Sequence, residues 1–242
     1  MPAKFSSSRA LRQLVLSTLG ASSWEQKWTG ILQEYGPQKL VSSLFSALFS
    51  TRDTIHWHAV SCMGEAVSQL AAERMETARI VVRRLMWSLN DESGGIGWGA
   101  PEAMGEILAR DSCLAGEYSS ILLSYITPGD GPDNYLEYAP LRQGAYWGIA
   151  RLAQARPQLI QPWEQTLAHA LQREREPKSL LLICLAFSNL DFISPAARSG
   201  LKELSANQES VCIYWQREFQ THILGAQAQE ALAADQGHVP KS

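Results

Sequence analysis

A ten-residue pattern that recurs about every 40 residues constrains the fold of this chain more than any other feature. Ile55–Gly64 and Ile96–Gly105 share isoleucine, tryptophan, alanine, methionine and glycine in register, and a glutamate follows each copy. Two looser copies follow at Leu141–Ala150 and Pro177–Ala186. A period of roughly 40 residues is typical of arrays in which each repeat is a pair of antiparallel helices.

The spacing of apolar residues also indicates helices. Apolar side chains recur at i, i+3 and i+4 in segments such as 11–19 and 40–48, and alternating β-branched runs are absent. We therefore expect no strands. Proline- and glycine-rich breakers divide the chain into about a dozen helices. The sequence predicts an all-α fold, a right-handed α-solenoid (armadillo/HEAT-like superhelix) of about five or six antiparallel helix pairs.

We expect one domain, residues 1–242, with four parts. Residues 1–36 are predicted to form capping helices and residues 37–190 the HEAT-like repeats. Residues 191–233 are predicted to form a C-terminal helix pair, whose last helix runs from about Ser210 to Ala233, and residues 234–242 a flexible tail.

The repeated pattern resembles the second helix of HEAT-like repeats of the phycobilisome-lyase type, in which Val-Arg-x-x-Ala-x-x-Ala-Leu-Gly follows an aspartate. His56 and Gly97 stand at the arginine slot of the first two copies, so an arginine does not join those repeats. Residues 90–106 also resemble a signature of a small bacterial HEAT-like group. The resemblance implies an α-solenoid. The matching positions are Asp53, Ile55, Ala59, Cys62, Met63 and Gly64, and Leu141, Arg142, Ala145, Gly148, Ile149 and Ala150.

Composition argues against two classes of partner. A net charge of −3 and a pI near 6.0 provide no basic face for nucleic acid or an anionic membrane. No window approaches the roughly 18 apolar residues of a membrane span.

The cysteines lack the spacing of a zinc site, so we interpret all four as buried thiols in a reducing compartment. The expected location is the cytoplasm, and no cofactor is predicted.

The segment Asn90–Glu106, with the sequence NDESGGIGWGAPEAMGE, interrupts this helical pattern with five glycines. Its glycines could expose N–H groups to a phosphate, but no strand precedes it, no Lys-Ser/Thr follows, and two acids would repel the ligand. It could also be a long turn whose glycines adopt positive φ so that Trp98 packs between repeats. In the third interpretation it is a recognition surface with Trp98 as apolar anchor.

We expect the recognition surface to bind a peptide or partner protein through the concave face of the solenoid. Trp98 would be the anchor, and nearby carboxylates would accept hydrogen bonds from a cationic or amide-bearing partner. A second irregular loop, Pro128–Tyr135, is expected on the same edge, because solenoid insertions concentrate on the binding face. The oligomeric state is left open. The predicted binding residues are Asp91, Glu92, Gly95, Gly97, Trp98, Glu106, Trp57, Tyr138, Arg142 and Trp147.

Catalytic and metal sites are not predicted. His56 and His58 are two residues apart on a helix and point in different directions, so they cannot chelate one ion together. Glu65 and Glu106 occupy equivalent repeat positions and could act as an acid–base pair, but pairing with an arginine such as Arg83 or Arg84 is the commoner role.

Two alternative functions remain open. The resemblance to chromophore lyases implies a role in handling small molecules or tetrapyrroles, which predicts a deep aromatic pocket. HEAT-like DNA-repair glycosylases would require a basic concave face with a central aspartate. Most tryptophans, including Trp24, Trp28, Trp87, Trp163 and Trp215, are expected in the core. Trp57, Trp98 and Trp147 could instead line one surface with Tyr138 and Tyr146.

Overall fold

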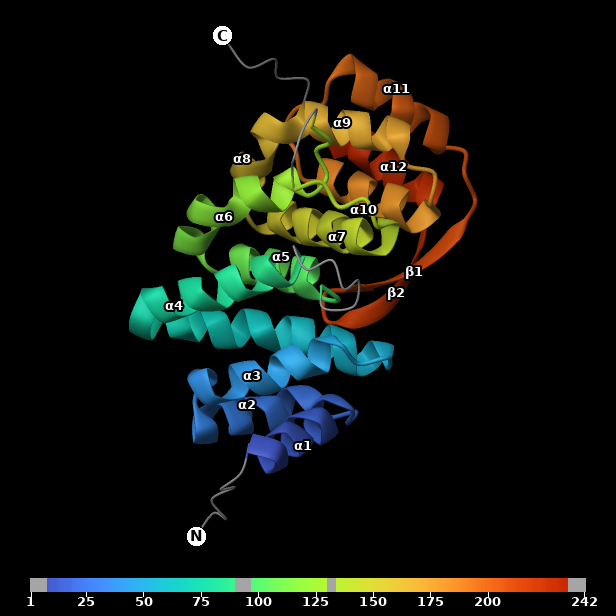
Figure 1. Ribbon diagram of the computed structural model, residues 1–242. Coiled ribbons are helices and arrows are strands. Elements are labelled where there is room, and N and C mark those ends of the chain that lie inside the picture. Colours follow the sequence, from blue (N-terminus) through green and yellow to red (C-terminus); the bar gives the residue numbers. More distant parts are fainter. Residues whose placement is uncertain (1–7, 90–96, 130–133, 235–242) are drawn as a thin grey trace. The chain divides into compact units, whose positions relative to one another are not determined.

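The computed structural model describes residues 8–89, 97–129 and 134–234, and the chain forms two compact units, residues 1–111 and 112–242. In the first unit, α1 packs on α2 and α3, α3 packs on α4, and α4 packs on α5 (Figure 1). These helices are α1 (Ser8–Leu19), α2 (Trp24–Tyr35), α3 (Pro37–Leu48), α4 (Asp53–Leu89) and α5 (Ala100–Arg110).

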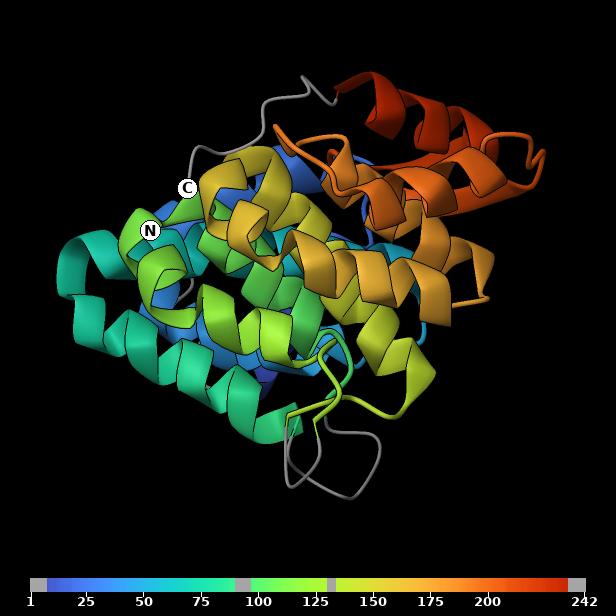
Figure 2. The ribbon, with the colours of Figure 1, turned by 90° about the horizontal axis from the view of Figure 1, so that it is seen from above.

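The second unit contains the remaining helices and a β-hairpin. Helix α10 packs on α7, α9 and α12, and α11 packs on α9 and α12 (Figure 2). The elements are α6 (Ser112–Ser124), α7 (Ala139–Ala155), α8 (Pro157–Ile160), the 3₁₀ turn η1 (Gln161–Trp163), α9 (Glu164–Arg173), α10 (Pro177–Phe187), α11 (Pro195–Leu204), β1 (Ser210–Trp215), β2 (Glu218–Ile223) and α12 (Leu224–Ala234).

Prolines mark the beginnings of many helices. A proline occupies the first or second position of α3, α5, α7, α10 and α11. Proline fits there because its fixed φ suits the first turn and its missing N–H would have no partner in the helix. The breakers in the sequence therefore locate helix starts.

Three of the four sequence copies lie on helices, namely the N-terminal half of α4, α7 and α10. In the second copy, residues 97–99 form a turn and residues 100–105 lie on α5. Helix α4 is two helices joined at Arg74, where φ is −154° and ψ is 87°.

The small residues of the pattern allow close helix packing. A Cβ atom on Gly64 would lie 2.5 Å from Cγ of Glu106, so α4 and α5 approach each other only because residue 64 has no side chain. Ala59 and Ala145 are fully buried in their units. The interpretation of Gly64 as a crossing point is thus supported by the geometry.

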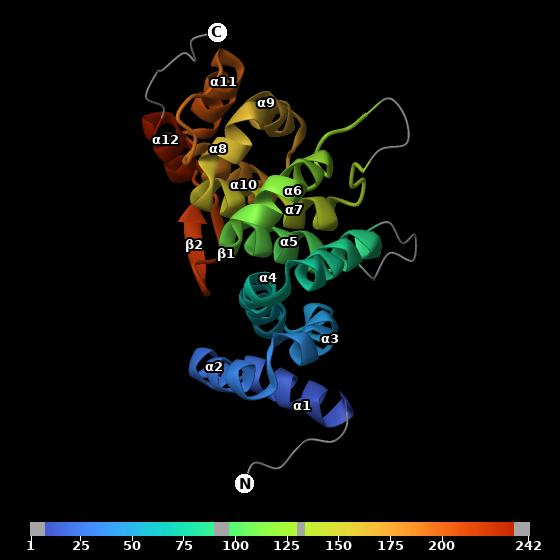
Figure 3. The same ribbon diagram turned by 90° about the vertical axis from the view of Figure 1, so that its left-hand side faces the viewer.

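The predicted long helix from Ser210 to Ala233 is wrong, as is the prediction that strands are absent. Residues 210–223 form an antiparallel hairpin, in which Ser210 pairs with Ile223 and Trp215 with Glu218 (Figure 3). Gln216 and Arg217 form the turn with φ of 51° and 74°. Two-residue hairpin turns require positive φ and usually contain Asn-Gly, so Gln-Arg gave no turn signal in the sequence.

Candidate functional site

The turn Gly97–Gly99 is fixed to the first unit at the start of α5. Gly99 has a φ of 75°, and an added Cβ atom would lie 2.9 Å from Cε1 of His56 and 3.1 Å from Cβ of Leu48. The Ala103 N–H donates to the Gly99 carbonyl at 2.9 Å, and the Ala100 N–H donates to the Gly97 carbonyl at 3.0 Å. Glycine is required at position 99 both by its backbone conformation and by the close packing.

His56 secures the surface on which this turn rests. Its Nδ1 lies 2.7 Å from the carbonyl oxygen of Leu48, at the end of α3. The last carbonyls of a helix have no partner within the helix, so this bond satisfies one of them. His56 therefore has a structural role in joining α3, α4 and the turn before α5.

Trp98 projects from this anchored turn. Its side chain is 40% exposed, whereas its neighbours Gly97 and Gly99 are buried. Phe49 directly follows Leu48, which touches Gly99, and is 43% exposed. We call Phe49 and Trp98 the turn patch. Each of these two exposed aromatic residues is the sequence neighbour of a residue in the Leu48–Gly99 contact, and exposed aromatic side chains are enriched in binding hot spots.

A second exposed apolar region lies on the C-terminal half of α4. Trp87 is 80% exposed and Ile80 is 56% exposed, and their spacing of seven residues places them on one helix face. The prediction that Trp87 lies in the core is wrong. In the sequence, Trp87 precedes the glycine-rich segment and Trp98 lies within it.

Glu106 is not placed to receive a partner. It is buried, and its Oε1 accepts a hydrogen bond from Nε of Arg110 at 2.6 Å. Arg110 also lies 3.5 Å from Glu65 through Nη2. The two glutamates of neighbouring repeats thus share one arginine, which is Arg110 rather than the predicted Arg83 or Arg84. Arg110 follows Glu106 by four residues, a spacing that the sequence displays but that we overlooked.

Arg142 belongs to a buried polar cluster in the second unit. Its Nε donates to Oε1 of Glu174 at 2.8 Å, and Nη1 donates to the carbonyls of Leu136 and Glu137. The Tyr146 hydroxyl donates to the same Glu174 oxygen at 2.9 Å. Arg142 therefore connects the start of α7 to the segment between α9 and α10. Its groups are occupied by these internal contacts.

Burial and neighbouring charges shift the pKa values of Glu174 and Tyr146 in this cluster. Burial by itself raises the pKa of Glu174, but hydrogen bonds from Arg142 and Tyr146 and the positive charges of Arg142 and Arg173 outweigh it and lower that pKa. Burial, reinforced by the negative charge of Glu174, raises the pKa of Tyr146. The cluster therefore holds an ionised carboxylate and neutral phenol, an arrangement suited to structural support.

Trp57 and Trp147 are buried and do not form an exposed aromatic surface. Trp147 donates from Nε1 to the Tyr214 carbonyl at 2.6 Å and meets Trp215 edge-on, with ring centroids 5.9 Å apart. These contacts attach the hairpin to α7. Tyr146 is also buried, whereas Tyr138 is 53% exposed.

Some predicted site residues cannot be assessed in the structure. Asp91, Glu92 and Gly95 lie outside the described residues. Trp98 belongs to the first unit and Tyr138 to the second. The expectation that they share one concave surface therefore stays a prediction. Gly99 has the positive φ that was expected of glycines in this segment.

The four cysteines differ in their burial. Cys62 and Cys184 are buried as predicted, but Cys113 and Cys212 are exposed, so the prediction of four buried thiols is wrong for these two. Burial raises the pKa of Cys184 to about 12.

His58 bonds to the Leu19 carbonyl at 2.7 Å and stacks on Trp24. Among the described residues, His, Cys, Asp and Glu side chains form no group of three or more that could hold a metal.

None of the helices in the described ranges combines the length and the apolar character needed to span a bilayer.

Comparison with known proteins identifies the fold and no family. No protein-family model and no curated protein matches the chain. An engineered protein matches with 15% identity and a TM-score of 0.56, over 96% of this chain and 92% of its own. A computationally designed armadillo repeat protein for modular peptide recognition matches with 16% identity and a TM-score of 0.52, over 94% and 92%. A second designed armadillo repeat protein has 17% identity and a TM-score of 0.53, over 97% and 95%.

These similarities confirm the prediction of an all-α, armadillo/HEAT-like helical-repeat fold. Because the sequence identities are only 15–17%, these similarities establish the fold and not the function.

Proposed function

We propose that this chain is a non-enzymatic interaction module that binds a peptide or a segment of a partner protein at the turn patch. The observation that carries the proposal is the exposure of Trp98, at 40%, on a turn whose own backbone is fixed by Gly99, His56 and Leu48. A rigid base lowers the entropy lost on binding, and exposed aromatic side chains are the commonest anchors of protein interfaces.

The fold supports this proposal. Helical-repeat scaffolds present extended surfaces suited to peptides, and one structural neighbour is described as designed for modular peptide recognition. The proposed ligand segment carries an apolar side chain that packs on the turn patch. We further propose a basic or amide-bearing residue beside it, which would meet the carboxylates of Asp91 and Glu92.

The alternative of tetrapyrrole handling rests on the resemblance to phycobilisome-lyase repeats. It requires an aromatic pocket. The cavity between α1 and α3 is lined by serine and cationic side chains, with one leucine, and is not such a pocket. The exposed turn patch favours a partner that packs against a surface.

A selection from a displayed peptide library tests the proposal. Peptides enriched on the wild-type protein are measured against Trp98→Ala, with Phe219→Ala as the matched control because Phe219 is 43% exposed on the hairpin. We expect Trp98→Ala to weaken binding at least tenfold, about 1.4 kcal/mol, and Phe219→Ala to leave it unchanged. Equal affinities in all three proteins would reject the turn patch as the binding site.

A further inference from the structure

A polar cavity of about 330 Å³ lies between α1 and α3 in the first unit. Its size is at the lower end of the roughly 300–1,000 Å³ range of small-ligand sites. Helix α1 contributes two cations to its wall, and α3 contributes one cation and three serines. These residues are Arg9, Arg12, Lys39, Ser42, Ser43 and Ser46.

Helical spacing explains how the side chains come to share one wall. Lys39, Ser42, Ser43 and Ser46 are separated by three, one and three residues and form one stripe along α3. The neighbouring stripe of α3, which includes Leu40 and Leu44, is buried in the core. Serine has a lower helix propensity than alanine, so a run of serines at this interface is not explained by helix formation.

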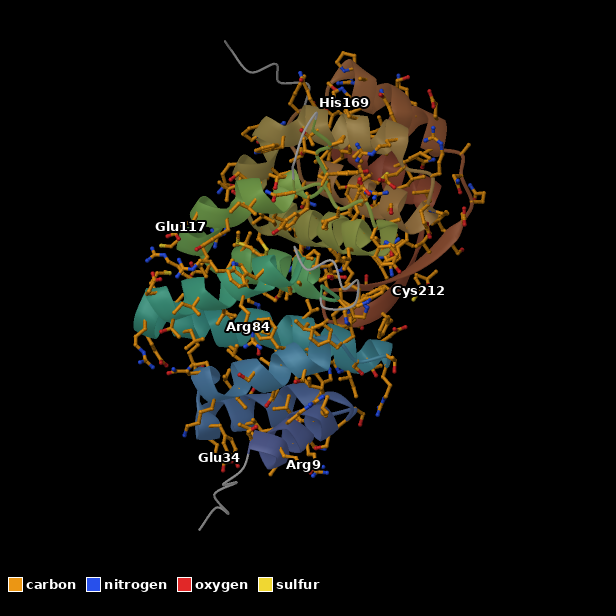
Figure 4. All side chains as sticks on the ribbon, viewed as in Figure 1. Arg9, Glu34, Arg84, Glu117, His169 and Cys212 are labelled. Atoms are coloured by element: carbon orange, nitrogen blue, oxygen red, sulfur yellow. The ribbon has the colours of Figure 1, made fainter. Side chains whose placement is uncertain are left out.

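The positive charges in the cavity are uncompensated. Neither α1 nor α3 contains an acidic residue, and Arg9, Arg12 and Lys39 form no ion pair within the described part of the chain. Figure 4 labels Arg9 on α1. An anion in the cavity would compensate these positive charges.

Ser43 adds a hydrogen-bond donor to the cavity wall. Its side chain lines the cavity, although the residue as a whole is only 6% exposed. Ser46 on the same stripe bonds back to the Ser42 carbonyl. The hydroxyl of a serine can both donate and accept, so the Ser43 Oγ–H can donate to a group inside the cavity.

We propose that this cavity binds a phosphate monoester. A phosphate monoester carries a charge of roughly −1.5 to −2 and three strong acceptor oxygens. Two guanidinium groups, one ammonium group and the Ser43 hydroxyl supply more donors than the two oxygens of a carboxylate can accept. The phosphate can belong to a small molecule or to a phosphorylated serine in a partner segment.

Calorimetric titration of the full chain separates these two sources. The probes are inorganic phosphate, a peptide that contains phosphoserine, and the same peptide without phosphate. We expect inorganic phosphate to bind with a Kd on the order of 1 mM or tighter. Tighter binding of the phosphopeptide identifies a phosphorylated partner as the source, whereas binding of inorganic phosphate alone identifies a small phosphate. Failure of both phosphate probes to bind overturns the proposal.

Three variants locate the binding. Arg12→Gln should weaken phosphate binding at least tenfold, and Ser43→Ala should weaken it about fivefold without changing the net charge. Lys27→Gln is the control. Lys27 is exposed on α2, so this substitution removes one positive charge outside the cavity. Circular dichroism checks that each variant is folded. An equal loss in Lys27→Gln, or full binding by Ser43→Ala, would show non-specific attraction and contradict the proposal.

Discussion

Single glycines determine how closely the helices of the first unit can approach. Gly64 lies on α4 against the buried, ion-paired side chain of Glu106, whereas Gly30 on α2 has no atom within 4 Å of the position a Cβ would take. Both are helical glycines, so the two sites differ in packing rather than in backbone conformation. The recurrence of glycine at the last position of the pattern is visible in the sequence, but the contact with Glu106 is shown only by the structure.

Replacing these glycines by alanine should therefore have opposite effects. Gly64→Ala should lower the free energy of unfolding by about 1–3 kcal/mol, because its methyl group overlaps Cγ of Glu106. Gly30→Ala should raise it by about 0.5–1 kcal/mol through helix propensity alone. Urea denaturation followed by circular dichroism measures both. Equal stabilisation by the two substitutions would show that the α4–α5 approach is looser than described.

At the scale of elements, the β-hairpin is the feature that the sequence did not reveal. Residues 210–215 contain the β-branched and aromatic side chains of a strand, but the turn lacks the glycine or asparagine that normally marks one. The strand is also held by long-range contacts, since Trp147 donates to the carbonyl of Tyr214. Such contacts cannot be inferred from local spacing.

The turn offers a direct test of the hairpin. Gln216 is exposed and has a φ of 51°, a conformation that costs most residues about 1–2 kcal/mol. Gln216→Asn should raise the midpoint of thermal unfolding, because asparagine tolerates this conformation better. Gln220→Asn, placed within β2, should give no such increase. A lower midpoint for Gln216→Asn would contradict the described turn.

The Arg142–Glu174 pair connects α7 to the segment between α9 and α10 in the second unit. Glu174 is buried and Arg142 largely so, with 7% and 12% of their side-chain areas exposed. Arg142 occupies the arginine slot of the third repeat copy and was predicted to bind a partner, whereas its guanidinium is engaged by Glu174. Glu174 lies 32 residues away and bears no local signal, so this internal pairing could not be predicted from the sequence.

Removing one charge of this pair should be destabilising. Glu174→Gln should lower the free energy of unfolding by about 3 kcal/mol at neutral pH, because Arg142 is left buried without its counter-charge. Glu176→Gln is the matched control, since Glu176 is exposed on the same segment. A loss of equal size in both variants would contradict the importance of the buried pair.

The same pair makes stability depend on pH in a defined direction. The pKa of Glu174 is lower in the folded chain than in the unfolded chain, whose value is about 4.3. The contribution of the Glu174 carboxylate to the free energy of unfolding is therefore complete above the pKa of the unfolded chain. It is lost as the pH falls through the pKa of the folded chain. The stability difference between wild type and Glu174→Gln should accordingly shrink as the pH is lowered below about 4.

At the scale of the whole molecule, the repeat period and the helical spacing predicted the fold class, because both follow from local periodicity. The binding residues were harder to predict. Trp57 and Trp147 look like surface anchors in the repeat pattern but are buried, whereas Phe49 gave no signal and is exposed beside the anchored turn. Exposure depends on how neighbouring repeats pack, which a single repeat does not encode.

The net charge of −3 likewise conceals local differences. It argued against nucleic acid and an anionic membrane as partners, yet α1 and α3 carry three cations and no acids around one cavity. A charge summed over a chain describes its long-range attraction, whereas a binding site depends on the charges within a few ångströms.

The most direct test of the central claim is the affinity of a selected peptide for wild type, Trp98→Ala and Phe219→Ala, measured by calorimetry on folded protein. Binding that weakens at least tenfold in Trp98→Ala and is unchanged in Phe219→Ala is the predicted result. Binding that is the same in all three proteins, or weakened equally by both substitutions, would contradict a recognition site at the turn patch.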